Sequence, residues 1–158
     1  MAARAADLID ASTPPDDLAA TAWLRAFADK RTAAVGGHAG LSRLLLSDQL
    51  TLGLPPPAVA LVAGAVIRTR ASILRKLVEG QSAGTLRADV PAAQLVPIVM
   101  GTVQIIALQR AGSVLPRAPG DAMTALDALL VLLAPPSATR PASNLSPTTT
   151  RRTSTRRK

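Results

Sequence analysis

The sequence predicts an all-α protein on three observations. Apolar residues recur at intervals of three and four along most of residues 1–133, the spacing that lines one face of a helix. No segment shows the strict apolar–polar alternation with β-branched residues that is typical of a strand. Glycine and proline interrupt the pattern and divide it into a short lead at 1–12 and about five helical stretches after it, which we expect to form one domain.

The first stretches lie before residue 57. Residues 1–12 favour a short helix, which Thr13 and two prolines interrupt. Two aspartates then favour the start of a helix that runs to about residue 35, where glycines end it. A shorter helix is expected at about 41–49, before the GLPPP segment at 53–57. The apolar residues of the stretch that ends at about residue 35 are Ala20, Trp23, Leu24, Phe27, Ala28 and Ala34.

A long helix is expected from about Pro57 to Ala83, with Gly84 placed to end it in the left-handed conformation. We expect one side to be core and the other to face water. The expected core residues are Val59, Val62, Val66, Ile73 and Leu77, backed by Ile67, Leu74 and Val78. The opposed polar row is Arg68, Ser72, Arg75 and Glu79.

Two strongly apolar helices complete the predicted fold. One starts at Pro91, runs to about Ala111 and is apolar nearly all round, with Gly101 at its centre. The other follows Asp121, a natural N-cap, and ends before Pro135. Its leucines, at the spacing of one helical face, are Leu126, Leu129, Leu130 and Leu133.

Composition argues against an enzyme. The chain has no cysteine and a single histidine, His38, so thiolate chemistry and a histidine-rich metal site are excluded. No phosphate-binding glycine loop, dinucleotide fingerprint or zinc-protease motif occurs. We therefore expect no catalytic residue, no metal and no cofactor, and interpret His38 as solvated or as a helix cap.

Positive charge is concentrated at the carboxyl end. Residues 134–158 carry six basic residues and no acid, in a formal net charge of +8 for the whole chain. This segment is rich in proline, serine and threonine, so we expect a disordered tail. It is either a solvated tail without a role or a basic arm with weak, salt-dependent affinity for nucleic acid. The residues of such an arm are Arg151, Arg152, Arg156, Arg157 and Lys158.

An uncharged run of twenty residues between Asp89 and Arg110 is long enough to span a bilayer. Three glutamines and two prolines within it argue against insertion. A small membrane protein therefore remains an alternative, but we expect a helix buried inside a cytoplasmic helical protein, since no secretory signal is visible at the start.

The last two helices carry more apolar surface than a small helical domain easily covers. A two-fold homodimer that joins both helices of each copy into a four-helix bundle would cover it; the alternative is a monomer with a central apolar helix. The residues predicted at the dimer interface are Gly101, Ile105, Leu108, Leu126, Leu129, Leu130 and Leu133.

Three segments carry a family resemblance: HAGLSRLLLSDQL at 38–50, RKLVEGQSAGTLRADV at 75–90 and PAAQLVPIVMGTVQIIALQ at 91–109. Together they resemble the C-terminal regulatory and dimerisation domain of TetR/AcrR-type transcriptional regulators, over roughly residues 14–133. Ala39 departs from the proline often found in the first segment. The matching positions are Glu79, Gly80, Gln81, Gly84, Leu86, Arg87 and Asp89, followed by Gly101, Gln104, Leu108 and Gln109.

The resemblance implies a repressor-type regulator whose last two long helices dimerise and whose interior holds a small hydrophobic effector. It also implies an N-terminal helix-turn-helix, which we do not find before Ala11. Residues 1–13 are then a lead, in the place of a linker helix, to the regulatory domain at 14–133. DNA becomes a partner only if that unit is supplied upstream, or weakly through the tail.

Four residues are candidates for the effector site. Trp23 and Phe27 lie one helical turn apart and place the only two rings of the protein on one patch, either as plain core or as the wall of a cavity. Met100 is an adaptable apolar filler, and Gln104, one turn further on, is an amide that would hydrogen-bond a ligand.

Overall fold

The computed structural model describes residues 2–36, 55–110 and 122–136. These ranges contain five helices and no strand, which confirms the all-α prediction. The helix expected at 41–49, His38, Asp121 and the basic residues of the tail lie outside the described ranges. The helices are α1 (Ala2–Ala11), α2 (Ala20–Gly36), α5 (Pro56–Ser82), α6 (Ala92–Arg110) and α7 (Ala122–Leu133).

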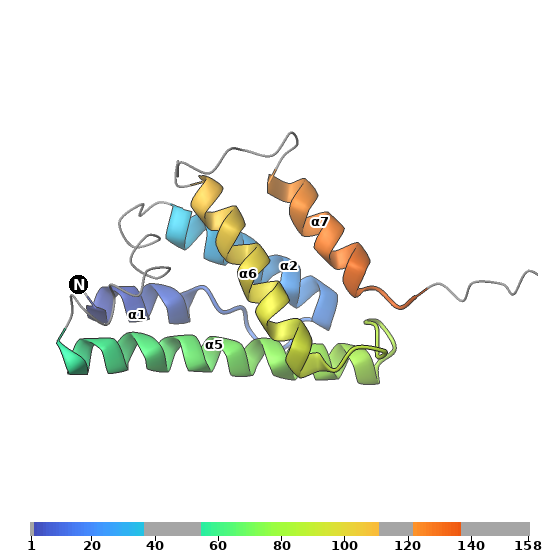
Figure 1. Ribbon diagram of the computed structural model, residues 1–158, viewed down its shortest axis with the longest axis horizontal. Coiled ribbons are helices and arrows are strands. Elements are labelled where there is room, and N and C mark those ends of the chain that lie inside the picture. Colours follow the sequence, from blue (N-terminus) through green and yellow to red (C-terminus); the bar gives the residue numbers. More distant parts are fainter. Residues whose placement is uncertain (1, 37–54, 111–121, 137–158) are drawn as a thin grey trace, which may run out of the picture.

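Helix α1 lies along the first half of α5, and the two run in the same direction (Figure 1). Small side chains allow this close packing, since Ala5 and Ala6 of α1 meet Val62 and Ala65 of α5 in a small buried cluster. Ile9 completes the cluster and is 1% exposed. Helix α1, which lies within the expected lead at 1–13, is therefore packed against α5.

The main core lies among α2, α6, α7 and the second half of α5, with α6 crossing over α5 (Figure 1). Trp23 and Phe27 of α2 are its largest side chains, and both are almost fully buried. Helix α7 packs against α6 and α2. The leucines that α7 contributes to this core are Leu126, Leu129, Leu130 and Leu133.

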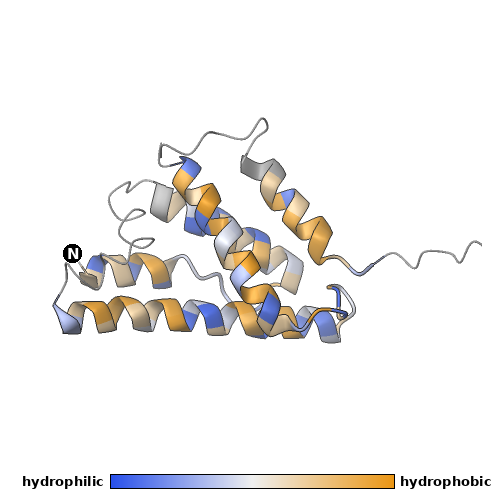
Figure 2. Ribbon diagram, viewed as in Figure 1, coloured by the Kyte–Doolittle hydropathy of each residue, from blue (hydrophilic) through white to orange (hydrophobic). Residues whose placement is uncertain are grey.

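Helix α5 carries apolar residues along most of its length (Figure 2), some of them buried and others exposed. Val62, Ile73 and Leu77 are buried as expected. The expectation that Ile67, Leu74 and Val78 back the core is wrong, because their side chains point outward and are 65%, 37% and 48% exposed. These three side chains form an outer apolar face of α5 that remains about half exposed.

The EGQSAGTLRAD segment connects α5 to α6 through a turn that is closed by hydrogen bonds. Gly84 has a φ of 68°, the left-handed conformation expected of it, and the carbonyl of Gly80 accepts hydrogen bonds from two later backbone amides. The amide of Gln81 donates to the carbonyls of Arg87 and Val90, at 2.8 and 2.7 Å. These bonds close the turn on itself.

Arg87 joins this turn to the end of α7. Its backbone amide donates to the carbonyl of Leu133 at 2.8 Å, and its guanidinium donates to the carbonyl of Leu132 at 3.1 Å. The guanidinium also pairs with Asp89, and this contact lowers the pKa of the Asp89 carboxyl. A cation and an amide therefore satisfy carbonyls that the last turn of a helix leaves free.

Gly80 lies where α5 approaches the start of α2, and this contact leaves no room for a side chain. A Cβ at this position would lie 2.5 Å from the Cδ1 of Leu86 and 2.8 Å from the Cβ of Ala20. We expect Gly80→Ala to lower the free energy of unfolding by about 2 kcal/mol through overpacking. Urea unfolding followed by circular dichroism measures it.

Gly84→Ala is the matched control. A Cβ at Gly84 meets nothing within 4 Å, so this variant reports only the cost of the left-handed backbone, about 1 kcal/mol. A Gly80→Ala protein as stable as the wild type would contradict the close approach of α5 and α2.

Candidate functional site

The two aromatic side chains share one patch on α2, as expected. The rings of Trp23 and Phe27 are stacked, with centroids 5.4 Å apart and planes 7° from parallel. The indole nitrogen of Trp23 donates to the carbonyl of Pro14 at 3.2 Å. The aromatic pair is thus fixed within the main core and tied to the segment that precedes α2.

Arg31 extends this stack by a further helical turn, and our sequence analysis did not single it out. Its guanidinium carbon lies 5.2 Å from the centroid of the Phe27 ring, within the range of a cation–π contact. Because Trp23, Phe27 and Arg31 are spaced by four residues, they lie on one face of α2. That spacing was the available signal, but it does not tell a buried cation from a solvated one.

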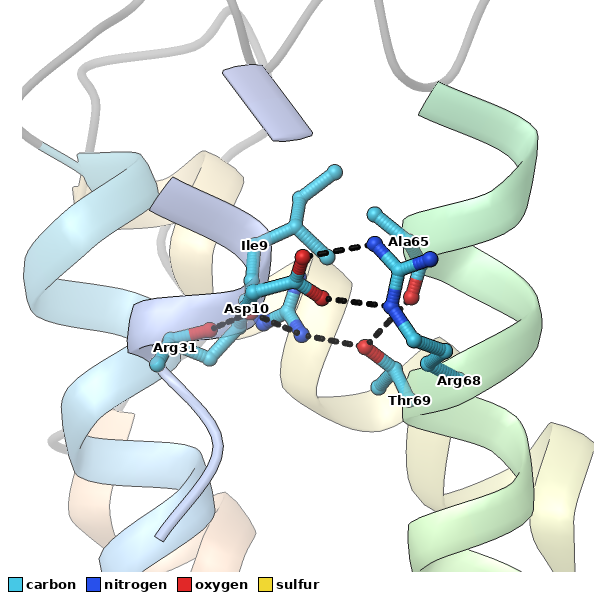
Figure 3. A network of polar contacts seen from close by, with 7 residues as sticks. Ile9, Asp10, Arg31, Ala65, Arg68 and Thr69 are labelled. Carbon is cyan, nitrogen blue, oxygen red and sulfur yellow. Dashed lines mark hydrogen bonds and ion pairs between the residues drawn. The ribbon is translucent and has the colours of Figure 1, made fainter. Parts of the chain in front are cut away.

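The Arg31 side chain is buried where α1, α2 and α5 meet (Figure 3). Its Nη2 donates to the carbonyl of Ile9 at 3.3 Å and to the hydroxyl of Thr69 at 3.0 Å. Its Nε is buried and has no hydrogen-bond partner in the described part of the chain. Burial lowers the pKa of Arg31 to about 10, although the charge of Asp10 opposes the shift.

The carboxylate in this cluster, that of Asp10, forms its ion pair with Arg68 and not with Arg31. Asp10 pairs with Arg68 through two hydrogen bonds, of 3.2 Å to its Nε and 2.6 Å to its Nη2. Both of these side chains are about half exposed. Figure 3 shows Asp10 between the two guanidinium groups and bonded to the one on α5. The cluster therefore holds two guanidinium groups and a single carboxylate.

The candidates on α6 have different surroundings. Met100 is half-buried and packs against the main core that contains Trp23 and Phe27. Gln104 is half-buried one turn further along α6, and its Nε2 is a buried donor with no partner among the described residues. The structure thus brings three of the four candidates into one cluster and gives the fourth an unused donor.

The seven residues predicted at a dimer interface fall into two groups. Gly101 and Ile105 on α6 are exposed. Leu108 on α6 is 5% exposed. The four leucines of α7 are at most 9% exposed, because α7 packs this face against α6 and α2 of its own chain. These five leucines are covered without a partner chain.

Other apolar side chains face outward on the same two helices. On α6, Ile98 is 51% exposed beside Gly101 and Ile105. On α7, Val131 and Leu132 are 74% and 64% exposed. Sequence analysis missed these three, since a helix that is apolar all round does not show which face its neighbours cover. A Cβ at Gly101 would meet nothing within 4 Å, so this surface has room for another backbone.

Two helices, α5 and α6, are long and apolar enough to cross a membrane. The most apolar window of α5 is 22% buried and that of α6 is 44% buried, so α6 has more of the character of a core helix. In the described ranges no three metal-ligating side chains gather to form a site.

No family model, no curated protein and no solved structure matches this chain.

Proposed function

We propose that this chain is a homodimeric, effector-binding regulatory domain of the TetR type, which responds to a small hydrophobic molecule. In this proposal DNA is a partner only if a helix-turn-helix is supplied upstream, or weakly through the basic tail. The effector binds one arrangement of the helices more tightly than another and so shifts the balance between them.

The observation that carries the proposal is the uncovered apolar surface of the last two helices. Ile98 and Ile105 on α6, with Val131 and Leu132 on α7, are large apolar side chains that are 45% exposed or more. Gly101 between the two isoleucines permits close approach of a second helix. Two copies that meet through α6 and α7 would form a four-helix bundle and remove these side chains from water.

The effector part of the proposal rests on the unused donor of Gln104. A buried amide without an acceptor costs free energy, and a bound molecule that offers an oxygen would recover it. Met100 lies one turn before Gln104 on the same side of α6 and packs against the core that contains Trp23 and Phe27. These side chains supply an apolar environment for a ligand.

The mass of the protein in solution tests the dimer. We expect the wild-type chain at micromolar concentration to elute with twice its 16.2 kDa mass by size exclusion with light scattering. Ile105→Asp places a charge at the centre of the proposed interface and is expected to give a monomer with unchanged helix content.

Leu61→Asp is the matched control, because Leu61 on α5 is 44% exposed against 45% for Ile105 and lies on another helix. It should remain dimeric. A monomeric wild type, or equal dissociation by both variants, would refute the interface on α6 and α7.

A membrane-associated function is the second candidate, and the outer apolar face of α5 favours it. Ile67, Leu74 and Val78 lie on one stripe of a helix long enough to span a bilayer. A membrane protein would stay with the lipid fraction after an alkaline carbonate wash, whereas the proposed dimer would be released.

A further inference from the structure

Neither acceptor of Arg31 depends on it. The carbonyl of Ile9 also accepts a hydrogen bond from the hydroxyl of Ser12, at 2.7 Å. The hydroxyl of Thr69, which accepts from Arg31, itself donates to the carbonyl of Ala65 at 3.1 Å. Both groups would remain hydrogen-bonded without the guanidinium. Arg31 is therefore not required to keep these two groups hydrogen-bonded.

The guanidinium itself is poorly compensated. Its side chain is 7% exposed, and no carboxylate of the described ranges forms an ion pair with it. The nearby carboxylate, Asp10, is held by Arg68. A buried charge without a counter-ion is costly, and a buried Nε–H without an acceptor adds to the cost. One more anion would balance both the charge and the free donor.

We propose that Arg31 receives the carboxylate head group of an apolar effector, with one carboxylate oxygen accepting the hydrogen bond of its Nε. This rests on the proposed function and names the chemical class of the effector. Charge-assisted hydrogen bonds of guanidinium to carboxylate are among the strongest that side chains form.

Trp23 reports on this site, because it is the only tryptophan and its ring stacks on the Phe27 ring that carries Arg31. The full-length chain is titrated with decanoate and with decanol, below micelle formation, and Trp23 emission is followed. We expect decanoate to bind about tenfold more tightly than decanol, as one charge-assisted hydrogen bond allows. In Arg31→Met this preference is lost and decanol affinity is unchanged.

Arg75→Met is the charge-matched control. Arg75 is an exposed arginine of α5 paired with Asp16, so its loss removes the same charge at another place. It should keep the preference for decanoate. Equal loss of the preference in both variants would show that net charge alone attracts decanoate, and would overturn the assignment to Arg31.

Thermal unfolding without ligand supplies a second measurement. Because Arg31→Met removes a poorly compensated charge and leaves both acceptors bonded, we expect its midpoint to rise by about 4 °C. A lower midpoint with unchanged decanoate affinity would make Arg31 a structural residue and overturn the proposal.

Failure of this inference is distinguishable from failure of the proposed function. Equal binding of decanoate and decanol by the wild type overturns the carboxylate site and leaves effector binding standing. Binding of neither probe also overturns it, while the mass of the wild-type chain and of Ile105→Asp decides independently whether the dimer exists.

Discussion

Replacing Trp23 with alanine is expected to lower the free energy of unfolding by about 4 kcal/mol. Trp23 is fully buried at the centre of the main core, and its truncation would leave a large space among α2, α6 and α7. The variant also loses the stack on Phe27 and the hydrogen bond to Pro14. Urea unfolding followed by far-ultraviolet circular dichroism measures the loss without using the missing fluorophore.

Trp23→Phe separates these contributions. It keeps an aromatic ring in the core but removes the indole donor, so the carbonyl of Pro14 loses its partner. We expect a loss of about 1–2 kcal/mol. If Trp23→Ala cost less than this, the interior around α2 would be loosely packed, and the stacked arrangement of the two rings would be refuted.

The helix boundaries were predictable because proline and glycine act locally. The long helix expected at Pro57–Ala83 is observed at Pro56–Ser82, and the next begins immediately after Pro91. Gly84 takes the left-handed conformation that its place after the helix favoured. Each of these signals depends on the conformational range of a single residue and needs no knowledge of the rest of the fold.

The burial of each helix face was less predictable. Periodicity shows how many apolar faces a helix has, but not which face a neighbour covers. Ile67 on α5 and Leu133 on α7 both belong to apolar stripes, yet the first is 65% exposed and the second 2% exposed. The difference comes from contacts between distant segments, which the pattern within one helix does not encode.

The candidate site divides in the same way. The shared patch of Trp23 and Phe27 followed from a spacing of four along one helix, although their stacking did not. The polar surroundings of Arg31 did not, because its partners lie on α1 and α5, 22 and 38 residues away in the sequence. An arginine that follows two aromatic residues at the same spacing indicates a shared helix face, but not that the cation is buried.

Lys76→Met is expected to lower the free energy of unfolding by about 3 kcal/mol. The Lys76 side chain is 2% exposed, and its ammonium donates to the carbonyls of Asp16 and Leu18 and to the carboxylate of Glu79, at 2.7, 2.9 and 2.8 Å. In the described ranges no other donor reaches these two carbonyls. Since each partly buried carbonyl would lose its partner, the costs add.

Glu79→Gln is the control for the ion pair. Glu79 is half-exposed and the amide keeps an acceptor oxygen, so we expect a loss below about 1 kcal/mol. If Lys76→Met were as stable as the wild type, the two carbonyls would be satisfied without the ammonium. The role of Lys76 in joining α5 to the segment before α2 would then be refuted.

Lys76 and Arg31 are both buried cations of this fold, and the same substitution by methionine is expected to act on them with opposite sign. The two carbonyl acceptors of Lys76 have no other donor in the described part of the chain, whereas both acceptors of Arg31 keep a hydrogen bond of their own. Stability measurements on the two variants, made under one set of conditions, therefore distinguish a cation that holds the fold together from one that the fold carries for a ligand. A fall in both would assign Arg31 to the first kind.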